Sequence, residues 1–399
     1  MPVIPFPHSF FLIRRASYKL VRGSLITSDA LVNCKDLMHS AKTEIRIAIT
    51  AADKRMAPTL MYLIAKGDAF GKNQPVVLHL IDIPENLDMV RGFAMELMES
   101  GLPLLRDVIV TSKLEEAFKD IDVAFLLPYP KLTPQISRKD RLEERFALYK
   151  LHGEALNLYA KKTVLVLIVG YSANTRAHIC SLYAPSIPYT NFAGLSLFAQ
   201  NIATTLVSSR LRIKIEDIKD IIVWGNTTDL IYADLRHAVI KMPLEEKEIS
   251  AYAAIKDDFW IKGEFNNTVR ELSFDVTDAK RTVAMSVAAI DHMKNWWFGT
   301  PPNHLTSMVV RSDGSYNIPK ELFFSFPVTI EDKKWKIVKG LDLQEFDLMK
   351  LDENIKELKK ERNEAFGICK RFWTFPTRQR IEEETESDMQ FAQFLDTES

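Results

Sequence analysis

Five short, strongly apolar segments between residues 44 and 175 constrain the fold of this chain more than any other feature of its sequence. They are rich in β-branched residues, show no polar alternation, and are separated by longer segments with helical periodicity. Strands of this kind are buried on both faces, as in a parallel sheet with helices on each side. The sequence therefore predicts a Rossmann-type, doubly wound parallel sheet with strands at Ile45–Thr50, Val76–Asp82, Val108–Thr111, Val123–Leu127 and Val164–Val169.

The second half of the chain mixes helices and strands, and we expect an α+β domain there. Helices are predicted over 195–211 and 277–295, a strand over 221–224, a hairpin over 322–328 and 335–338, and a charged helix over 342–365. The predicted organisation is an N-terminal extension (1–43), a Rossmann-like domain (44–189), a C-terminal domain (190–366) and a tail (367–399).

Composition excludes several classes of protein. The chain has 399 residues, and its 52 basic and 53 acidic side chains leave a net charge of -1, so no overall field attracts nucleic acid or anionic lipid. No apolar run reaches the roughly 18 residues that span a bilayer, which predicts a soluble protein. Cys34, Cys180 and Cys369 lie far apart in the sequence, which argues against a disulfide framework and a zinc site and fits a reducing compartment.

The first 28 residues contain no acidic side chain, although several arginines lie among apolar residues. This composition is typical of a mitochondrial presequence, whereas the three prolines before residue 8 suit an ordinary flexible arm. A cytoplasmic location is the first expectation and a mitochondrial one is the alternative.

The end of the chain changes composition again. The segment Lys370–Arg380 is basic and aromatic, and the residues that follow it carry seven acidic side chains and no basic one. A solvated tail is the favoured interpretation. The alternative is an interaction segment that binds a protein partner through its aromatic side chains.

The turn after the first predicted strand is unusual for a dinucleotide site. It reads Ala51-Ala52-Asp53-Lys54-Arg55-Met56-Ala57 and contains no glycine, although backbone N–H groups must approach a pyrophosphate closely there. The next strand ends in Asp82, where a carboxylate would hold the adenosine ribose. A carboxylate at a strand end is by itself a weak signal, since such positions often hold turn residues.

Several long segments resemble the lactate/malate dehydrogenase family, and within it the animal cytosolic malate dehydrogenases. The segments that carry the resemblance are FGKNQPVVLHLIDI (70–83), MELMESGLPLLRDVI (95–109), EEAFKDIDVAFL (115–126), LYAKKTVLVLIVG (158–170), APSIP (184–188), IVWGN (222–226), AIKDDFWIKGEF (254–265) and WFGTP (297–301). The resemblance covers residues 44–366. It implies a dinucleotide-binding domain followed by a substrate domain, NAD-dependent interconversion of malate and oxaloacetate, and a homodimer.

The cofactor positions implied by the resemblance are altered. Ala51 and Lys54 stand where the family has glycines, with Arg55 beside them, and Asp82 matches the ribose carboxylate. Added Cβ atoms push a pyrophosphate away from the backbone donors, although Lys54 and Arg55 offer positive charge. NAD binding is therefore possible but doubtful.

The substrate and catalytic positions implied by the resemblance have lost most of their polar groups. One substrate arginine remains as Arg138, while the other two arginine positions are Leu132 and Ile202, and the asparagine position is Tyr171. The catalytic aspartate position is Ala199, and the catalytic histidine position is Thr227. A threonine hydroxyl does not titrate near neutral pH, so it does not replace a histidine as proton shuttle.

Other residues offer poor substitutes for the missing histidine. Asp229 is the nearest acid in sequence, Gln200 does not titrate, and His152 and His178 fall in helical stretches of the first domain. The sequence therefore predicts a pseudoenzyme with a binding or structural role. Two alternatives stay open: a weak or re-purposed dehydrogenase for 2-oxo acids that keeps Arg138 and Asp82, and a structural partner, for instance of the cytoskeleton, that binds through its terminal extensions.

Overall fold

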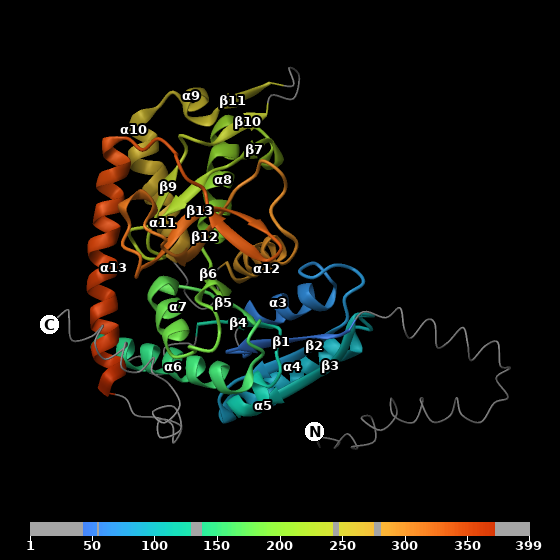
Figure 1. Ribbon diagram of the computed structural model, residues 1–399. Coiled ribbons are helices and arrows are strands. Elements are labelled where there is room, and N and C mark those ends of the chain that lie inside the picture. The colour runs from blue at the N-terminus through green and yellow to red at the C-terminus, as the bar shows by residue number, and fades with distance from the viewer. Residues whose placement is uncertain (1–42, 54–55, 129–137, 242–246, 275–280, 372–399) are drawn as a thin grey trace, which may run out of the picture. The chain divides into compact units, whose positions relative to one another are not determined.

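A nine-stranded mixed sheet organises the computed structural model, which describes residues 43–53, 56–128, 138–241, 247–274 and 281–371 (Figure 1). Its strand order is β14-β13-β12-β6-β5-β4-β1-β2-β3. The strands of this sheet are β1 Ile45–Thr50, β2 Val76–Ile81, β3 Leu105–Thr111, β4 Val123–Leu126, β5 Leu165–Ile168, β6 Phe192–Gly194, β12 Thr306–Arg311, β13 Phe323–Glu331 and β14 Lys334–Ile337.

The first six strands form a parallel sheet, which contains the five predicted strands and one more, β6. They lie in the order β3-β2-β1-β4-β5-β6, and each neighbouring pair is parallel. This order places β1 and β4 side by side at the point where the chain changes direction across the sheet, and ligands of such sheets bind at the carboxyl ends of these strands. The predicted Rossmann-type fold is confirmed.

Three antiparallel strands extend the same sheet beyond β6. Strand β12 pairs with β6 at Val309 and Gly194, and then pairs with β13 along its whole length. The predicted hairpin is confirmed as β13 and β14, and its two turn residues, Asp332 and Lys333, both have positive φ. Two consecutive residues of this kind form the tight turn that matches the twist of antiparallel strands.

Helices and small sheets complete the fold. The helices are α3 Met56–Ala65, α4 Leu87–Glu99, α5 Leu114–Phe118, α6 Arg138–Tyr159, α7 Ala173–Leu182, α8 Leu197–Leu211, α9 Ala251–Ile255, α10 Asp258–Trp260, α11 Asn266–Phe274, α12 Thr282–Phe298 and α13 Glu345–Arg371. Short 3-10 or π segments are η2 Pro84–Asn86, η3 Tyr189–Asn191, η4 Ile215–Asp217, η5 Ile261–Phe265 and η6 Ser315–Asn317. The small sheets contain β7 Ile218–Lys219, β8 Ile222–Trp224, β9 Tyr232–Asp234, β10 Val239–Lys241 and β11 Glu248–Ser250.

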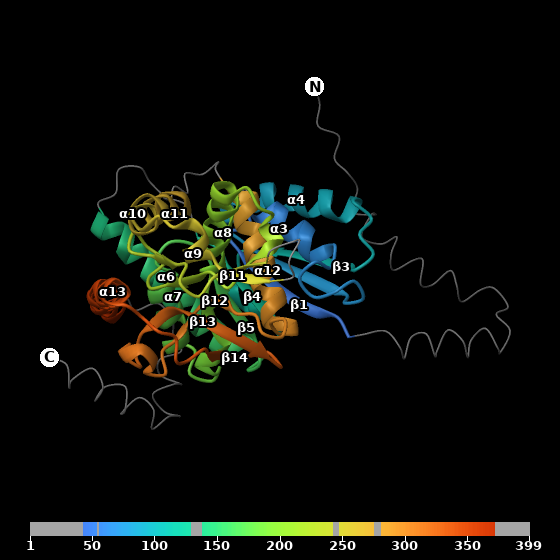
Figure 2. The ribbon, with the colours of Figure 1, turned by 90° about the horizontal axis from the view of Figure 1, so that it is seen from above.

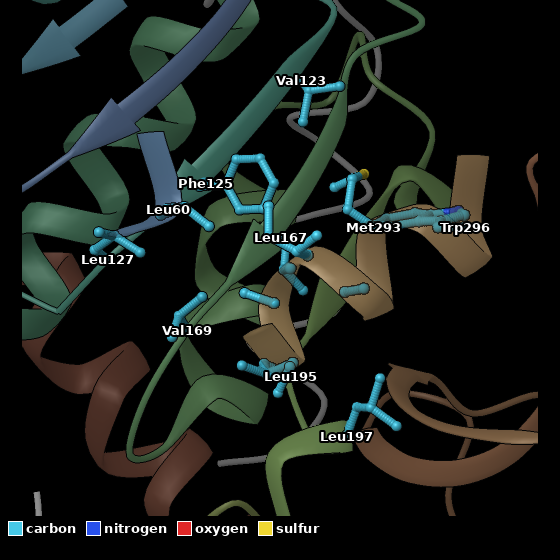
Figure 3. Close-up of a cluster of buried hydrophobic side chains, with 14 of the residues drawn as sticks. Leu60, Val123, Phe125, Leu127, Leu167, Val169, Leu195, Leu197, Met293 and Trp296 are labelled. Atoms are coloured by element: carbon cyan, nitrogen blue, oxygen red, sulfur yellow. The ribbon is translucent and has the colours of Figure 1, made fainter. Parts of the chain in front are cut away.

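The core explains why the first strands carry no polar alternation. Successive residues of β4 belong to different clusters: Val123 and Phe125 pack with helices on one face of the sheet, and Ala124 and Leu126 pack on the other. Figure 3 shows the first of these clusters, where side chains from β4 and β5 lie near those of α12. A strand that is covered on both faces needs apolar side chains in every position.

Three boundaries differ from the sequence-based predictions. Strand β3 begins at Leu105, earlier than expected, because it lies at the sheet edge, where the exposed Arg106 and Asp107 interrupt its apolar run. Helix α12 begins at Thr282 rather than at 277. Helix α13 continues to Arg371 because Ile368 and Cys369 are buried, so the predicted start of the tail at 367 falls inside a helix.

The described residues from Glu44 onward form one compact unit, and the predicted division near residue 190 stays a prediction. Within the described ranges no helix combines the length and the apolar character needed to cross a membrane. In the same part of the chain no three His, Cys, Asp or Glu side chains come together as a possible metal site.

Three buried histidines make the fold sensitive to acid. Burial lowers the pKa of His152, of His178 and of His292 to about 3, against an ordinary value of 6.5. All three stay neutral in the folded protein while the unfolded chain takes up protons below pH 6.5, so stability is present above that pH and is lost as the pH falls. We expect the free energy of unfolding to drop by about 3 kcal/mol between pH 6.5 and 5.5.

Urea titrations at a series of pH values measure this loss. The variant His292→Met removes one of the three groups and should reduce the slope by about a third. A slope in this pH range that is unchanged in His292→Met would show that other groups cause the acid sensitivity.

Candidate functional site

Thr227 lies in a hydrogen-bonded connection between the loop after β8 and the start of α7. Its hydroxyl donates to Asn174 Oδ1 at 2.8 Å and accepts from the Ala173 backbone N–H at 2.8 Å. Its own backbone N–H also donates to Asn174 Oδ1 at 2.8 Å, and the residue is 2% exposed. The single hydroxyl proton of Thr227 is therefore used inside the protein.

Two asparagine side chains hold this loop in place. Asn174 Nδ2 donates to the carbonyl oxygens of Gly225 and Phe323, at 3.1 and 3.0 Å. Asn354 of α13 accepts from the Asn226 backbone N–H at 2.7 Å. Gly225 has φ +98, and a Cβ on it would lie 2.3 Å from Asn354 Oδ1, so only glycine fits between the loop and the helix.

A small cavity of about 20 Å³ lies beside Thr227. It is lined by Gly170, Leu195, Phe198, Ala199, Thr227, Ile231, Ser273 and Met285. The structure thus brings Ala199 and Thr227 together, as the resemblance implies. No lining residue has a side chain that titrates near neutral pH, and a cavity of this size holds about one water molecule.

The residues considered as substitutes for the missing histidine lie elsewhere. Asp229 is exposed and does not line the cavity, and Gln200 accepts a hydrogen bond from the Ser307 backbone N–H at 2.8 Å. His152 packs against Phe118 in the core of the first half. His178 packs against aromatic side chains of β13 and α13, and burial lowers its pKa to about 3.

The predicted substrate positions are only partly described. Tyr171 follows β5 and is 38% exposed. Ile202 lies in α8 and packs against a cluster of buried apolar side chains. Arg138 begins α6, but its side chain lies outside the described part of the structure, and so does Leu132.

The described part of the cofactor loop departs from the glycine-rich turn that the resemblance implies. Ala51 is fully buried and has φ +50, a backbone conformation that glycine adopts without strain and alanine does not. Asp53 adds a carboxylate at the end of this turn, where negative charge opposes a phosphate. Lys54 and Arg55 lie outside the described residues.

Asp82 is at the predicted ribose position but is already hydrogen-bonded. Its carboxylate accepts from the backbone N–H groups of Asp53 and Ile83 and from Asn86 Nδ2, at 2.9, 2.8 and 2.8 Å, and it is 2% exposed. A carboxylate offers about four acceptor positions, so one remains for a ribose diol. The residues present fit the ribose in part.

Sequence reasoning missed Asn174, Asn354 and Arg176. Asn174 lies in the recognisable stretch after β5, but a side chain that bonds across to residues 225 and 323 has no local signature. Asn354 lies in a charged helix, where an asparagine resembles any other solvated residue. Arg176 is discussed below, because its burial is visible only in the structure.

The bonds of Thr227 yield a stability prediction. Thr227→Val keeps the shape of the side chain but leaves the buried Ala173 N–H and one acceptor position of Asn174 without a partner. We expect the free energy of unfolding to fall by about 2–4 kcal/mol, measured by urea denaturation. Thr227→Ser keeps the hydroxyl and should lose only about 1 kcal/mol. Equal stability of the two variants would contradict the structural role of this hydroxyl.

Comparisons with known proteins agree with this architecture. Residues 45–193 match the lactate/malate dehydrogenase NAD binding domain, and residues 203–368 match the alpha/beta C-terminal domain of the same family. Cytoplasmic malate dehydrogenase of Bos taurus is 44% identical over 326 residues, which cover 81% of this chain and 97% of the relative. The Homo sapiens protein is 43% identical over the same length.

Solved structures show the same likeness. Malate dehydrogenase from Naegleria fowleri superposes with a TM-score of 0.75 at 30% identity, covering 82% of this chain and 100% of that one. Trichomonas vaginalis lactate dehydrogenase in complex with NADH and oxamate gives 0.76 at 31% identity, with coverage of 82% and 100%. The chain belongs to the lactate/malate dehydrogenase family.

Proposed function

We propose that this protein is a member of its family without malate dehydrogenase activity, and that its function is binding or structural. The observation that carries the proposal is the state of Thr227. It stands where the resemblance places the catalytic histidine, its hydroxyl proton is committed to Asn174, and no neighbour in the cavity titrates near neutral pH. Among the described residues, the site therefore lacks a group that exchanges a proton with a substrate hydroxyl.

The expected loss of rate is large. General acid–base catalysis contributes about 10²- to 10⁴-fold. A dicarboxylate substrate that faces Leu132 and Ile202 instead of two arginines also loses charge-assisted hydrogen bonds of about 1.5–3 kcal/mol each. These losses need not add, but each of them opposes turnover.

The same proposal covers cofactor, location and partners. NAD binds weakly at most, because the loop at Ala51 and Asp53 is unsuited to a pyrophosphate and Asp82 keeps one acceptor position. A cytoplasmic location is supported by the cytoplasmic relatives. Protein partners that bind through the terminal extensions stay a proposal, because residues 1–42 and 372–399 lie outside the described structure.

A homodimer is also proposed, on the evidence of an exposed apolar surface. Helix α3 packs against both α4 and α12, and Figure 2 shows these three helices next to one another. The exposed large apolar side chains on them are Tyr62, Met89, Met95, Val283, Val287 and Phe298. An extended apolar surface of this kind suits a second copy of the chain.

The absence of turnover is directly measurable. The full chain should reduce oxaloacetate with NADH at less than about one thousandth of the rate of an active cytoplasmic relative. The double variant Ala199→Asp, Thr227→His should remain far below the relative, because Leu132 and Ile202 still leave the substrate without its clamp. Oxaloacetate reduction by the unaltered chain above that thousandth would disprove the proposal.

A second candidate function is a weak or re-purposed dehydrogenase for 2-oxo acids. The sequence favours it in two positions, Arg138 and Asp82, which match a substrate arginine and the ribose carboxylate of the family. A pocket with a single arginine suits a monocarboxylate better than oxaloacetate. This candidate requires NAD to bind.

A nucleotide titration separates the two candidates. We expect NADH to bind the unaltered chain with a Kd near or above about 1 mM, followed by fluorescence or calorimetry. Ala51→Gly together with Lys54→Gly should tighten binding at least about tenfold, because backbone N–H groups can then approach the pyrophosphate. Asp82→Asn in that variant should remove most of the gain. Micromolar binding by the unaltered chain would overturn the weak-cofactor proposal and favour the second candidate.

A further inference from the structure

Arg176 is a buried cation with no counter-charge. It lies in the second turn of α7, is 3% exposed, and its backbone N–H donates to the Ser172 carbonyl oxygen at 3.2 Å. Its Nε and Nη1 atoms are buried and have no hydrogen-bond partner, and no described carboxylate forms an ion pair with it. Its guanidinium carbon, Cζ, lies over the ring of Tyr149 in α6, 5.2 Å from the ring centroid.

A buried guanidinium in this state is strongly unfavourable, because desolvation is not offset by an opposite charge or by acceptors. The same fold compensates another buried arginine in the ordinary way. Arg362 of α13 is 4% exposed and pairs with Glu321 at 3.4 Å. The contrast indicates that the counter-charge of Arg176 does not come from the described residues.

The N-terminus of α7 lies in the direction of the Arg176 side chain. Side chains on a helix point back toward its N-terminus, so the guanidinium lies alongside the first turn of α7, between this helix and α6. The backbone N–H groups of that first turn have no acceptor within the helix, and the helix dipole adds positive potential there. Ala173 N–H is used by Thr227, which leaves those of Asn174 and Thr175.

A second buried group at this place also lacks a partner. The Thr175 hydroxyl is one residue from Arg176, the residue is 3% exposed, and its Oγ1 atom makes no hydrogen bond in the described part of the chain. A hydroxyl donates readily to a negatively charged oxygen. The start of α7 therefore carries two buried donor groups without a partner among the described residues, and an acceptor that reaches both lies toward the N-terminus of the helix.

We propose that Arg176, Thr175 and the N-terminus of α7 form a binding site for a compact oxyanion, such as a carboxylate or phosphate group. A guanidinium binds either group with two parallel hydrogen bonds, and the burial of the site limits the ligand to a small one. The site lies about one helical turn from Ala173, whose backbone N–H donates to Thr227. It stands independently of whether the protein turns over malate.

Calorimetry on the full chain tests the site with inorganic phosphate and, separately, with acetate, at constant ionic strength. We expect one ion per chain and a dissociation constant that Arg176→Met raises about 10- to 100-fold, as for the loss of a charge-assisted hydrogen bond. Arg176→Lys keeps the charge but not the paired geometry and should give an intermediate value. The two probes distinguish a phosphate-bearing ligand from a carboxylate.

The matched control is Arg210→Met. Arg210 also stacks on an aromatic ring, that of Trp260, but it is exposed and paired with Asp257, so its removal should leave anion binding unchanged. If Arg176→Met does not fold, Arg176→Lys and Thr175→Val take its place in the test. Thr175→Val keeps the positive charge of Arg176 and should still weaken anion binding. The proposal is wrong if the unaltered chain binds neither probe at about 10 mM ion and a 50-fold excess of ion over protein. It is also wrong if the Arg176 variants bind the ions as tightly as the unaltered chain.

Discussion

The side-chain amides of Asn174 and Asn354 hold the loop Gly225–Thr227 between α7 and α13, and the shape of the candidate site depends on this attachment. Each amide uses both of its ends. Asn174 accepts from Thr227 while it donates to Gly225 and Phe323, and Asn354 accepts from Asn226 while it donates to Leu230. Such a network is stable only as a whole, because removing one member leaves buried groups without partners.

This attachment also explains why Thr227 is a poor starting point for proton transfer. A general base needs a free lone pair that faces the substrate and a proton that can leave. The Thr227 hydroxyl donates a hydrogen bond to Asn174 and accepts one from the Ala173 N–H. Both partners lie on α7, and neither of them lines the cavity. Thr227, at the position where the resemblance places a histidine, is therefore part of the hydrogen-bonded scaffold.

The sequence predicted the sheet well and the site only in part, for physical reasons. Strands β1, β2 and β4 are covered on both faces, so their apolar runs are unbroken, and their predicted bounds differ from the observed ones by at most one residue. Strand β3 has an exposed edge, and Arg106 and Asp107 hid its beginning. The meeting of Ala199 with Thr227 followed from the resemblance alone, since the residues are 28 positions apart on different elements.

The burial of Arg176 could not be predicted from its residue type. Arginine is almost always found at the surface, so a sequence gives no reason to place this one in the interior. The interactions of Asn174 and Asn354 are equally hidden, because they join positions that are 51 and 128 residues apart in the chain. Patterns reveal which face of an element is buried, but the partner of a buried polar group is a property of the assembled fold.

The polar positions on which the proposed function rests can be replaced together without destabilising the fold. Where one partner of a buried charged pair is removed, the other is left unpaired, and the cost is severe. Where both are replaced by apolar groups, the change is close to neutral and is often stabilising. Ala199, Ile202 and Thr227 replace the charged or titratable positions together, and the apolar lining around Ala199 leaves no stranded charge in the cavity. Under the proposed function, the stability of this scaffold does not depend on its catalytic groups, and the buried charge of Arg176 is balanced by the proposed oxyanion.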